Sequence, residues 1–209
     1  MRKVVRMATL RATQKALTRQ LLLDAGLELF QTGGYASTTI DEIATKAGTT
    51  RVTFYAHFSS RSDLMKALID EKLNSAADRT RTPDRGSTAP QLVEVVRDGS
   101  PERLADWIRK TSGFWPTVVP ILRVAREAAV VDPELSTLVE VWMEEAVSDI
   151  VEGLDQAGRF DANTRRYRAA LAMTQFDHTA LHWPSPGWRL EHEQMVQVMT
   201  QSWLTLLAD

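Results

Sequence analysis

The stretch TIDEIATKAGTTRVTFYAHF, residues 39–58, decides the fold predicted for this chain. Thr39 followed three residues later by Glu42 is the pattern of a capping box, which starts a helix. Gly48 is placed to end that helix in a left-handed conformation, and Thr50 is placed to cap a second short helix. Two short helices joined by a tight turn that contains glycine have the form of a helix-turn-helix.

The second of these helices, residues 50–57, is predicted to present a polar outer face. A recognition helix must project from its domain to enter a major groove about 12 Å wide, so the helix before it needs small residues such as Ala44 and Ala47 for close bracing. Phe54 and Phe58 lie one turn apart and are assigned to the core. The expected outward donors are Thr50, Arg51, Thr53, Tyr55 and His57. The alternative is that these are ordinary solvated side chains of a helical protein.

The flanking sequence predicts further helices and no strand, so the fold class is all-α. Apolar residues at three- and four-residue spacing, Leu17, Leu21 and Phe30 among them, predict a buried face on a first helix over residues 10–32. Residues 80–90, rich in Pro, Gly, Ser and Thr, read as a mobile loop. Cap residues for later helices stand at Ser60, Ser100, Asp132 and Asp161.

Residues 21–68, LLLDAGLELFQTGGYASTTIDEIATKAGTTRVTFYAHFSSRSDLMKAL, resemble the DNA-binding domain of the tetracycline-repressor (TetR) family. The resemblance lies in an ordered set of short motifs: Gly34-Tyr35, Thr38-Thr39-Ile40, Ile43-Ala44, Ala47-Gly48, Phe54-Tyr55, His57-Phe58 and the basic Arg61. It implies that base edges are met by Arg51, Val52 and Thr53. It implies that phosphates are held by Thr39, Tyr55, His57 and Arg61.

Three residues depart from the family pattern. Ala56 stands where an aromatic residue is frequent, and Asp41 cannot hold a phosphate, so two potential DNA contacts are missing. Gly26 replaces the usual alanine in the first helix at a cost of roughly 1 kcal/mol, which points to close packing.

The resemblance also implies a division of labour along the chain. Residues 1–60 are expected to form an N-terminal arm and a three-helix DNA-binding domain, and residues 61–209 a helical ligand-binding and dimerisation domain. In this family the last two long helices, here about 161–183 and 189–207, meet their symmetry mates in a four-helix bundle. A homodimer suits a palindromic operator, whose two half-sites require two rigidly held recognition helices.

All six tryptophans lie beyond the helix-turn-helix, where the resemblance places a ligand cavity. The expected lining residues are Trp107, Phe114, Trp115, Trp142, Met143, Met173 and Phe176. Such a lining would suit an aromatic or lipophilic effector. The alternative is that these side chains fill ordinary core or dimer interface.

The resulting hypothesis is a transcriptional repressor that a small molecule releases from double-stranded operator DNA. In the free dimer the recognition helices match successive grooves, and ligand favours a conformation in which the fourth helix moves them out of register. The alternative is a ligand-independent activator or architectural DNA-binding protein. A Ser-His-Asp hydrolase is disfavoured, because no Gly-x-Ser-x-Gly motif occurs, so no enzymatic activity is expected.

Charge and composition fit this hypothesis. Residues 1–66 carry a net charge of +5 and the remainder −7, which makes the front end the candidate for a polyanion. The first twenty residues carry basic but no acidic side chains. A flexible arm that approaches DNA is favoured over an organellar transit peptide, and a secretory signal is disfavoured.

The chain has no cysteine and no apolar run long enough to span a membrane, so the cytoplasm is expected. His178 and His182 have helical metal-binding spacing but no third ligand, so neither metal nor cofactor is expected.

Overall fold

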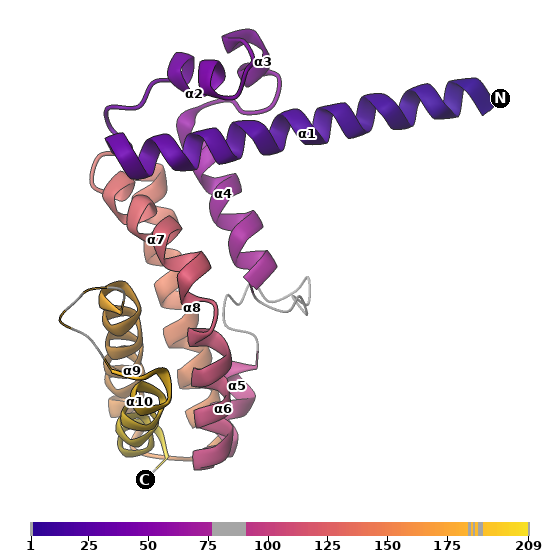
Figure 1. Ribbon diagram of the computed structural model, residues 1–209. Helices are drawn as coiled ribbons and strands as arrows, with labels where there is room; N and C mark the ends of the chain where they lie inside the picture. The colour runs from indigo at the N-terminus through magenta and orange to yellow at the C-terminus, as the bar shows by residue number, and fades with distance from the viewer. Residues whose placement is uncertain (1, 77–90, 184, 186, 188–189, 209) are drawn as a thin grey trace. The chain divides into compact units, whose positions relative to one another are not determined.

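The computed structural model describes residues 2–76, 91–183, 185, 187 and 190–208, with the backbone alone for residues 2–10 and 72–76. Within these residues all regular secondary structure is helical, in agreement with the predicted all-α class (Figure 1). The helices are α1 (Arg2–Gly33), α2 (Ile40–Lys46), α3 (Arg51–Tyr55), α4 (Arg61–Ala76), α5 (Leu92–Asp98), α6 (Pro101–Ser112), α7 (Trp115–Ala129), α8 (Pro133–Ala157), α9 (Ala162–His182) and α10 (His192–Leu207).

The chain packs as two compact units, and the residues that form each unit do not follow the expected division at residue 60. The first unit combines residues 1–71 with residues 120–136, and the second unit combines residues 72–119 with residues 137–209. A segment from the C-terminal half therefore packs with the helix-turn-helix. The helices α4, α7 and α8 each contain residues of both units.

The first unit is built on α1, which packs against α2. The buried face of α1 agrees with the prediction only in part: Phe30 is buried as expected, but Leu17 and Leu21 are 60% and 45% exposed, and Leu22 and Leu23 are fully buried instead. This face is set by the approach of α4, since a Cβ at Gly26 would lie 2.8 Å from the Leu64 side chain. The close packing expected at Gly26 is therefore present.

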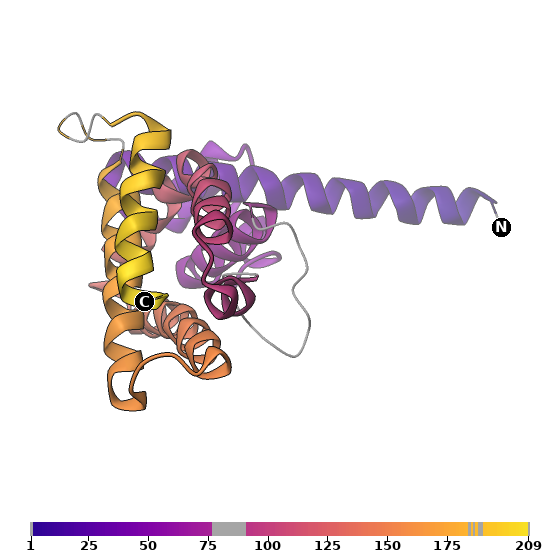
Figure 2. The same ribbon diagram turned by 90° about the horizontal axis from the view of Figure 1, so that it is seen from below.

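The basic N-terminal segment is helical, which corrects the expectation of a flexible arm. Helix α1 begins at Arg2 and runs without interruption to Gly33. Its N-terminal part extends beyond α2, α3 and α4 in both views (Figures 1 and 2). The predicted end at Gly33-Gly34 is confirmed, because Gly34 has φ +84°, a left-handed conformation that glycine adopts without steric cost.

Other predicted boundaries lie close to the observed ones. Helix α8 follows Asp132, whose carboxylate accepts hydrogen bonds from the backbone N–H groups of Glu134 and Leu135, and α9 follows Asp161, which caps Asn163. The predicted loop at 80–90 lies outside the described residues. No helix among the described residues is both long enough and apolar enough to cross a bilayer.

The core of the second unit is rich in aromatic side chains. Helix α10 packs against both α6 and α9, and α9 and α10 lie side by side (Figure 2). The indole ring of Trp203 is fully buried and stacks on Trp107 with ring centroids 5.4 Å apart. Phe176 contacts Trp107, Trp115 and Trp203 at centroid distances of 5.3, 5.2 and 5.8 Å.

Candidate nucleic-acid interface

Local hydrogen bonds form the two helices of the motif where the sequence predicted them. The Thr39 hydroxyl accepts the Glu42 N–H at 3.2 Å, and Glu42 Oε2 accepts the Thr39 N–H at 2.7 Å, which completes the capping box. Gly48 ends the turn with φ +66°, and the Thr50 hydroxyl accepts the Thr53 N–H at 3.3 Å. The helix-turn-helix is thus fixed by its own side chains at both helix starts.

Helix α3 has one buried and one exposed face. Phe54 is fully buried and packs against Phe58 at a ring-centroid distance of 5.8 Å, which anchors the helix. On the other side Val52 and Tyr55 are 80% and 47% exposed, although each carries a large hydrophobic surface. Exposed apolar side chains next to polar donors suit a surface that meets bases, because apolar groups contact the thymine methyl.

Arg51 is the charged residue of this exposed face. Its Nη1 pairs with Asp41 Oδ2 at 3.0 Å, and its guanidinium lies 5.7 Å from the centre of the Tyr55 ring. More than half of each charged side chain is exposed, and exposed ion pairs contribute little to stability. The sequence indicated Asp41 only as a residue that cannot hold a phosphate. In the structure Asp41 orients Arg51 on the α3 surface, and breaking this exposed ion pair would cost little energy.

The threonines of the predicted contact set have structural partners already. Thr39 and Thr50 are exposed and cap their helices, while Thr53 is half-buried with its hydroxyl 3.1 Å from that of Thr50.

His57 lies at the edge of this surface beside α1. Burial, and then the charges of Lys15 and Arg19, lower the pKa of His57 below its ordinary value. Its Nδ1 atom is buried and has no hydrogen-bond partner among the described residues. The imidazole is therefore neutral near pH 7, and the positive charges of Lys15 and Arg19 nearby favour an anion at this edge of the surface.

Arg61 makes structural contacts that the sequence did not predict. Its Nη1 donates to the carbonyl oxygens of Tyr35 at 2.8 Å and Ala36 at 3.1 Å, and also to that of Thr38. Its guanidinium also lies 4.9 Å from the centre of the Tyr35 ring. In this structure the Nη1 atom of Arg61 holds the loop between α1 and α2, and the phosphate contact that the resemblance implied stays a prediction.

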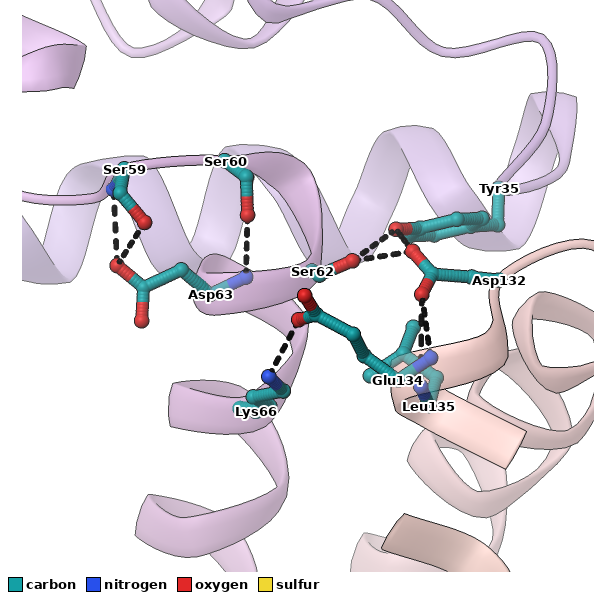
Figure 3. A network of polar contacts seen from close by, with 9 residues as sticks. All are labelled: Tyr35, Ser59, Ser60, Ser62, Asp63, Lys66, Asp132, Glu134 and Leu135. Carbon is teal, nitrogen blue, oxygen red and sulfur yellow. Dashed lines mark hydrogen bonds and ion pairs between the residues drawn. The ribbon is translucent and has the colours of Figure 1, made fainter. Parts of the chain in front are cut away.

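A buried polar cluster next to Arg61 was not anticipated from the sequence (Figure 3). The Tyr35 hydroxyl donates to Asp132 Oδ2 at 2.7 Å, and the Ser62 hydroxyl donates to the same oxygen. The Tyr35 and Ser62 hydroxyl oxygens are 3.3 Å apart. We call these three residues the Tyr35–Ser62–Asp132 junction. The sequence signalled Asp132 only as a helix cap, because its partners lie 97 and 70 positions away.

The structure brings together only part of the predicted ligand lining. Trp107, Trp115, Met173 and Phe176 belong to one buried cluster, and the half-buried Met143 packs against it. Phe114 is 43% exposed, and Trp142 is half-buried outside the cluster.

One further aromatic residue belongs to the same region of the second unit. Trp203 lies at the centre of the cluster, and its buried Nε1–H has no hydrogen-bond partner among the described residues. The sequence did not assign Trp203 to the ligand lining.

The two histidines with metal-binding spacing lie close together on α9. The imidazole rings of His178 and His182 stack with centroids 4.0 Å apart, and His182 Nδ1 lies 2.8 Å from the His178 carbonyl oxygen. Among the described residues no group of three His, Cys, Asp or Glu side chains is arranged to hold a metal ion.

An all-helical chain with a braced, outward-facing third helix belongs to the helix-turn-helix class of folds. Comparison with known proteins narrows this class to one family. Residues 22–68 match the family described as bacterial regulatory proteins, tetR family. Residues 22–68 of the chain are therefore similar to the DNA-binding region of this family.

Individual relatives resemble different parts of the chain. The HTH-type transcriptional regulator SrpR of Pseudomonas putida is 36% identical over 80 residues, 38% of this chain and 37% of SrpR. The match therefore spans well under half of that regulator. The HTH-type transcriptional regulator TtgR, also of Pseudomonas putida, is 28% identical over 167 residues, 75% of this chain and 74% of TtgR.

The fold is similar over nearly the whole length to a solved structure. NalD, described as the secondary repressor of the MexAB-OprM multidrug efflux pump in Pseudomonas aeruginosa, superposes with a TM-score of 0.69 at 18% identity. The similarity covers 93% of this chain and 97% of NalD.

Proposed function

We propose that this chain is a cytoplasmic transcriptional regulator that binds a specific operator in double-stranded DNA and represses transcription there. The observation that carries the proposal is α3, which is anchored by the buried Phe54 while Arg51, Val52 and Tyr55 face outward. A guanidinium on such a helix can bind the O6 and N7 atoms of guanine together, the commonest specific contact in a major groove. Thr39, Thr50, Thr53 and His57 are the proposed supporting contacts.

The proposed active form is a homodimer through α9 and α10. Tyr167 and Leu171 on α9 are 75% and 56% exposed, and Val198 on α10 is 64% exposed. The Ser202 hydroxyl of α10 donates to Gln175 Oε1 of α9 at 2.8 Å, so α9 and α10 pack against each other. The exposed apolar side chains therefore belong to one pair of packed helices. Large apolar side chains on adjacent exposed helices are typical of a protein interface.

The proposed effector is an aromatic or lipophilic small molecule that binds in the second unit. The aromatic cluster around Trp107, Trp115 and Phe176 supplies the required chemistry, and the buried Trp203 N–H offers a donor to a ligand acceptor. Effector binding would reach the DNA-binding helices through α4, which begins in the first unit at Arg61 and includes residues 72–76 of the second unit.

The second candidate is a DNA-binding activator or architectural protein without an effector. It shares the α3 surface and differs only in what the second unit does. Release from DNA by a small molecule separates the two candidates.

Operator selection from random duplex DNA with purified protein at a fixed salt concentration tests the proposal. The expected result is a palindrome with half-sites about one helical turn apart or a simple variant of that spacing. Affinity for it should fall steeply with added salt, because phosphate contacts release counterions. Failure to enrich any sequence would refute DNA recognition. An aromatic ligand panel titrated into the preformed complex then tests for an effector, and unchanged affinity across the panel favours the ligand-independent candidate.

A further inference from the structure

A single carboxylate, that of Asp132, joins three parts of the first unit. Its Oδ2 atom accepts the hydroxyls of Tyr35, after the end of α1, and Ser62, at the start of α4. Its Oδ1 atom accepts the backbone N–H groups of Glu134 at 3.1 Å and Leu135 at 3.4 Å, at the start of α8 (Figure 3). Every one of these contacts lies within the first unit.

The junction is buried enough for its geometry to be restrictive. Tyr35 is 2% and Ser62 8% exposed, and a buried polar group that loses its partner is far more costly than an exposed one. Burial, reinforced by Asp132, raises the pKa of Tyr35 to about 12, so its hydroxyl remains a donor at neutral pH. Partial burial of Asp132 favours its protonated form, but the hydrogen bonds from Ser62 and Tyr35 outweigh this effect and lower its pKa.

The junction is directly connected to the helix-turn-helix. Tyr35 opens the loop that leads to the α2 cap at Thr39, and Arg61 holds three carbonyl oxygens of the same loop. A shift of Asp132 would therefore move the start of α2 and the start of α4 together. Helix α8 continues from this point to Ala157, which belongs to the second unit.

We infer that Asp132 is a positioning residue for operator recognition, which fixes the helix-turn-helix to the first turn of α8 through Tyr35 and Ser62. The inference rests on the proposed function, since it concerns how a DNA-binding helix is presented. A dimer has to place two such helices at the spacing of two half-sites, so a loosened junction should impair the full palindrome more than a single half-site. The first turn of α8 thereby becomes part of the DNA-recognition apparatus.

The test compares Asp132→Asn with Tyr35→Phe on two duplexes, one with the full operator and one with a scrambled second half-site. Asparagine is also a good helix cap, so the start of α8 is retained. We expect Asp132→Asn to weaken binding to the full operator about tenfold and binding to the half-site less than about twofold, the size of effect that coupled buried contacts give. The double variant should be no weaker than Asp132→Asn alone, because both changes break the same junction.

Lys66→Gln is the matched control. Lys66 lies one turn after Ser62 on α4 and pairs with Glu134 of α8 at 2.7 Å, but this ion pair is exposed, so its loss should leave both affinities unchanged. If Asp132→Asn does not fold, Ser62→Ala replaces it in the same comparison. Equal weakening on both duplexes, or no weakening on either, would overturn the inference. Wild-type protein that fails to retain the selected operator would instead refute the proposed function.

Discussion

At the scale of single residues, Arg51 shows how a side chain can be oriented before it meets DNA. Its partners in the free protein are the Asp41 carboxylate and the Tyr55 ring, and both lie on the exposed surface around α3. Exchanging an exposed ion pair for a base edge costs little, while the planar guanidinium is already confined near the recognition surface.

Replacement of Arg51 by alanine should therefore weaken binding to the selected operator by about 5- to 150-fold, the equivalent of one bidentate base contact. Discrimination at one base pair should be lost with it. Fluorescence anisotropy on the operator and its single-base variants, at one salt concentration, measures both effects. Arg97→Ala is the control, since Arg97 is an exposed arginine of α5 in the second unit that donates to Gln156 Oε1 at 3.5 Å and lies on neither α9 nor α10. An operator affinity equal to that of wild type would contradict the proposed base contact.

His57 should make the folded state sensitive to acid. Because burial and the charges of Lys15 and Arg19 lower its pKa in the folded protein, the unfolded chain binds a proton more readily at this position. Above the ordinary histidine pKa of about 6.5, neutral His57 contributes its full share to stability. This contribution is lost as the pH falls below that value toward the lower pKa of the folded state.

His57→Gln should consequently lose less stability than wild type between pH 7 and pH 5, compared by urea midpoints. The other three histidines are the same in both proteins and cancel in the comparison. An identical loss in the two proteins would show that His57 titrates alike in the folded and unfolded states.

At the scale of helices, close approach between backbones depends on glycine at a particular position. In α8 a Cβ placed on Gly153 would lie 2.7 Å from the Val93 carbonyl oxygen and 2.7 Å from Val96 Cβ, both belonging to α5. A backbone oxygen cannot rotate away as a side-chain terminus can. No pattern in the sequence indicated this contact, because a lone glycine within a helical pattern fits several explanations.

Gly153→Ala should lower the free energy of unfolding by about 1–3 kcal/mol, the usual cost of overpacking, although alanine is the better helix former. Chemical denaturation monitored by circular dichroism measures this change. Gly33→Ala in α1 is the control, because its nearest atom would be Ser37 Oγ at an ordinary 3.8 Å. Gly153→Ala with wild-type stability would mean that α5 and α8 can separate without cost.

At the scale of the whole molecule, the two compact units do not follow the order of the chain. The first unit recruits residues 120–136, so the predicted domain 1–60 lacks a segment that packs with it in this structure. The proposed dimer is a second property of this scale, and Leu171 on α9, which is 56% exposed, lies on its proposed interface.

Leu171→Glu should shift the protein from dimer to monomer, because a charge at the proposed interface would be buried without a partner. Sedimentation equilibrium measures the change, and operator affinity should fall with it. Val130→Glu is the control: Val130 is 84% exposed and lies on neither α9 nor α10. A Leu171→Glu protein that sediments as wild-type dimer would exclude this face from the interface.

The sequence by itself determined the helices of the recognition motif and their starts. Thr39, Thr50 and Asp161 cap their helices as predicted, because a cap is a hydrogen bond between residues two or three positions apart. The Phe54 anchor of α3 and the all-helical class follow from equally local patterns.

Only the tertiary structure decided which faces are buried and which polar groups meet. Leu17 lies exposed although its spacing fits a buried face, and Arg61 binds three loop carbonyls instead of standing free. Asp132 finds Tyr35 and Ser62 across 97 and 70 positions of chain. These contacts depend on how helices distant in sequence pack together, and no short-range spacing along the chain encodes that packing.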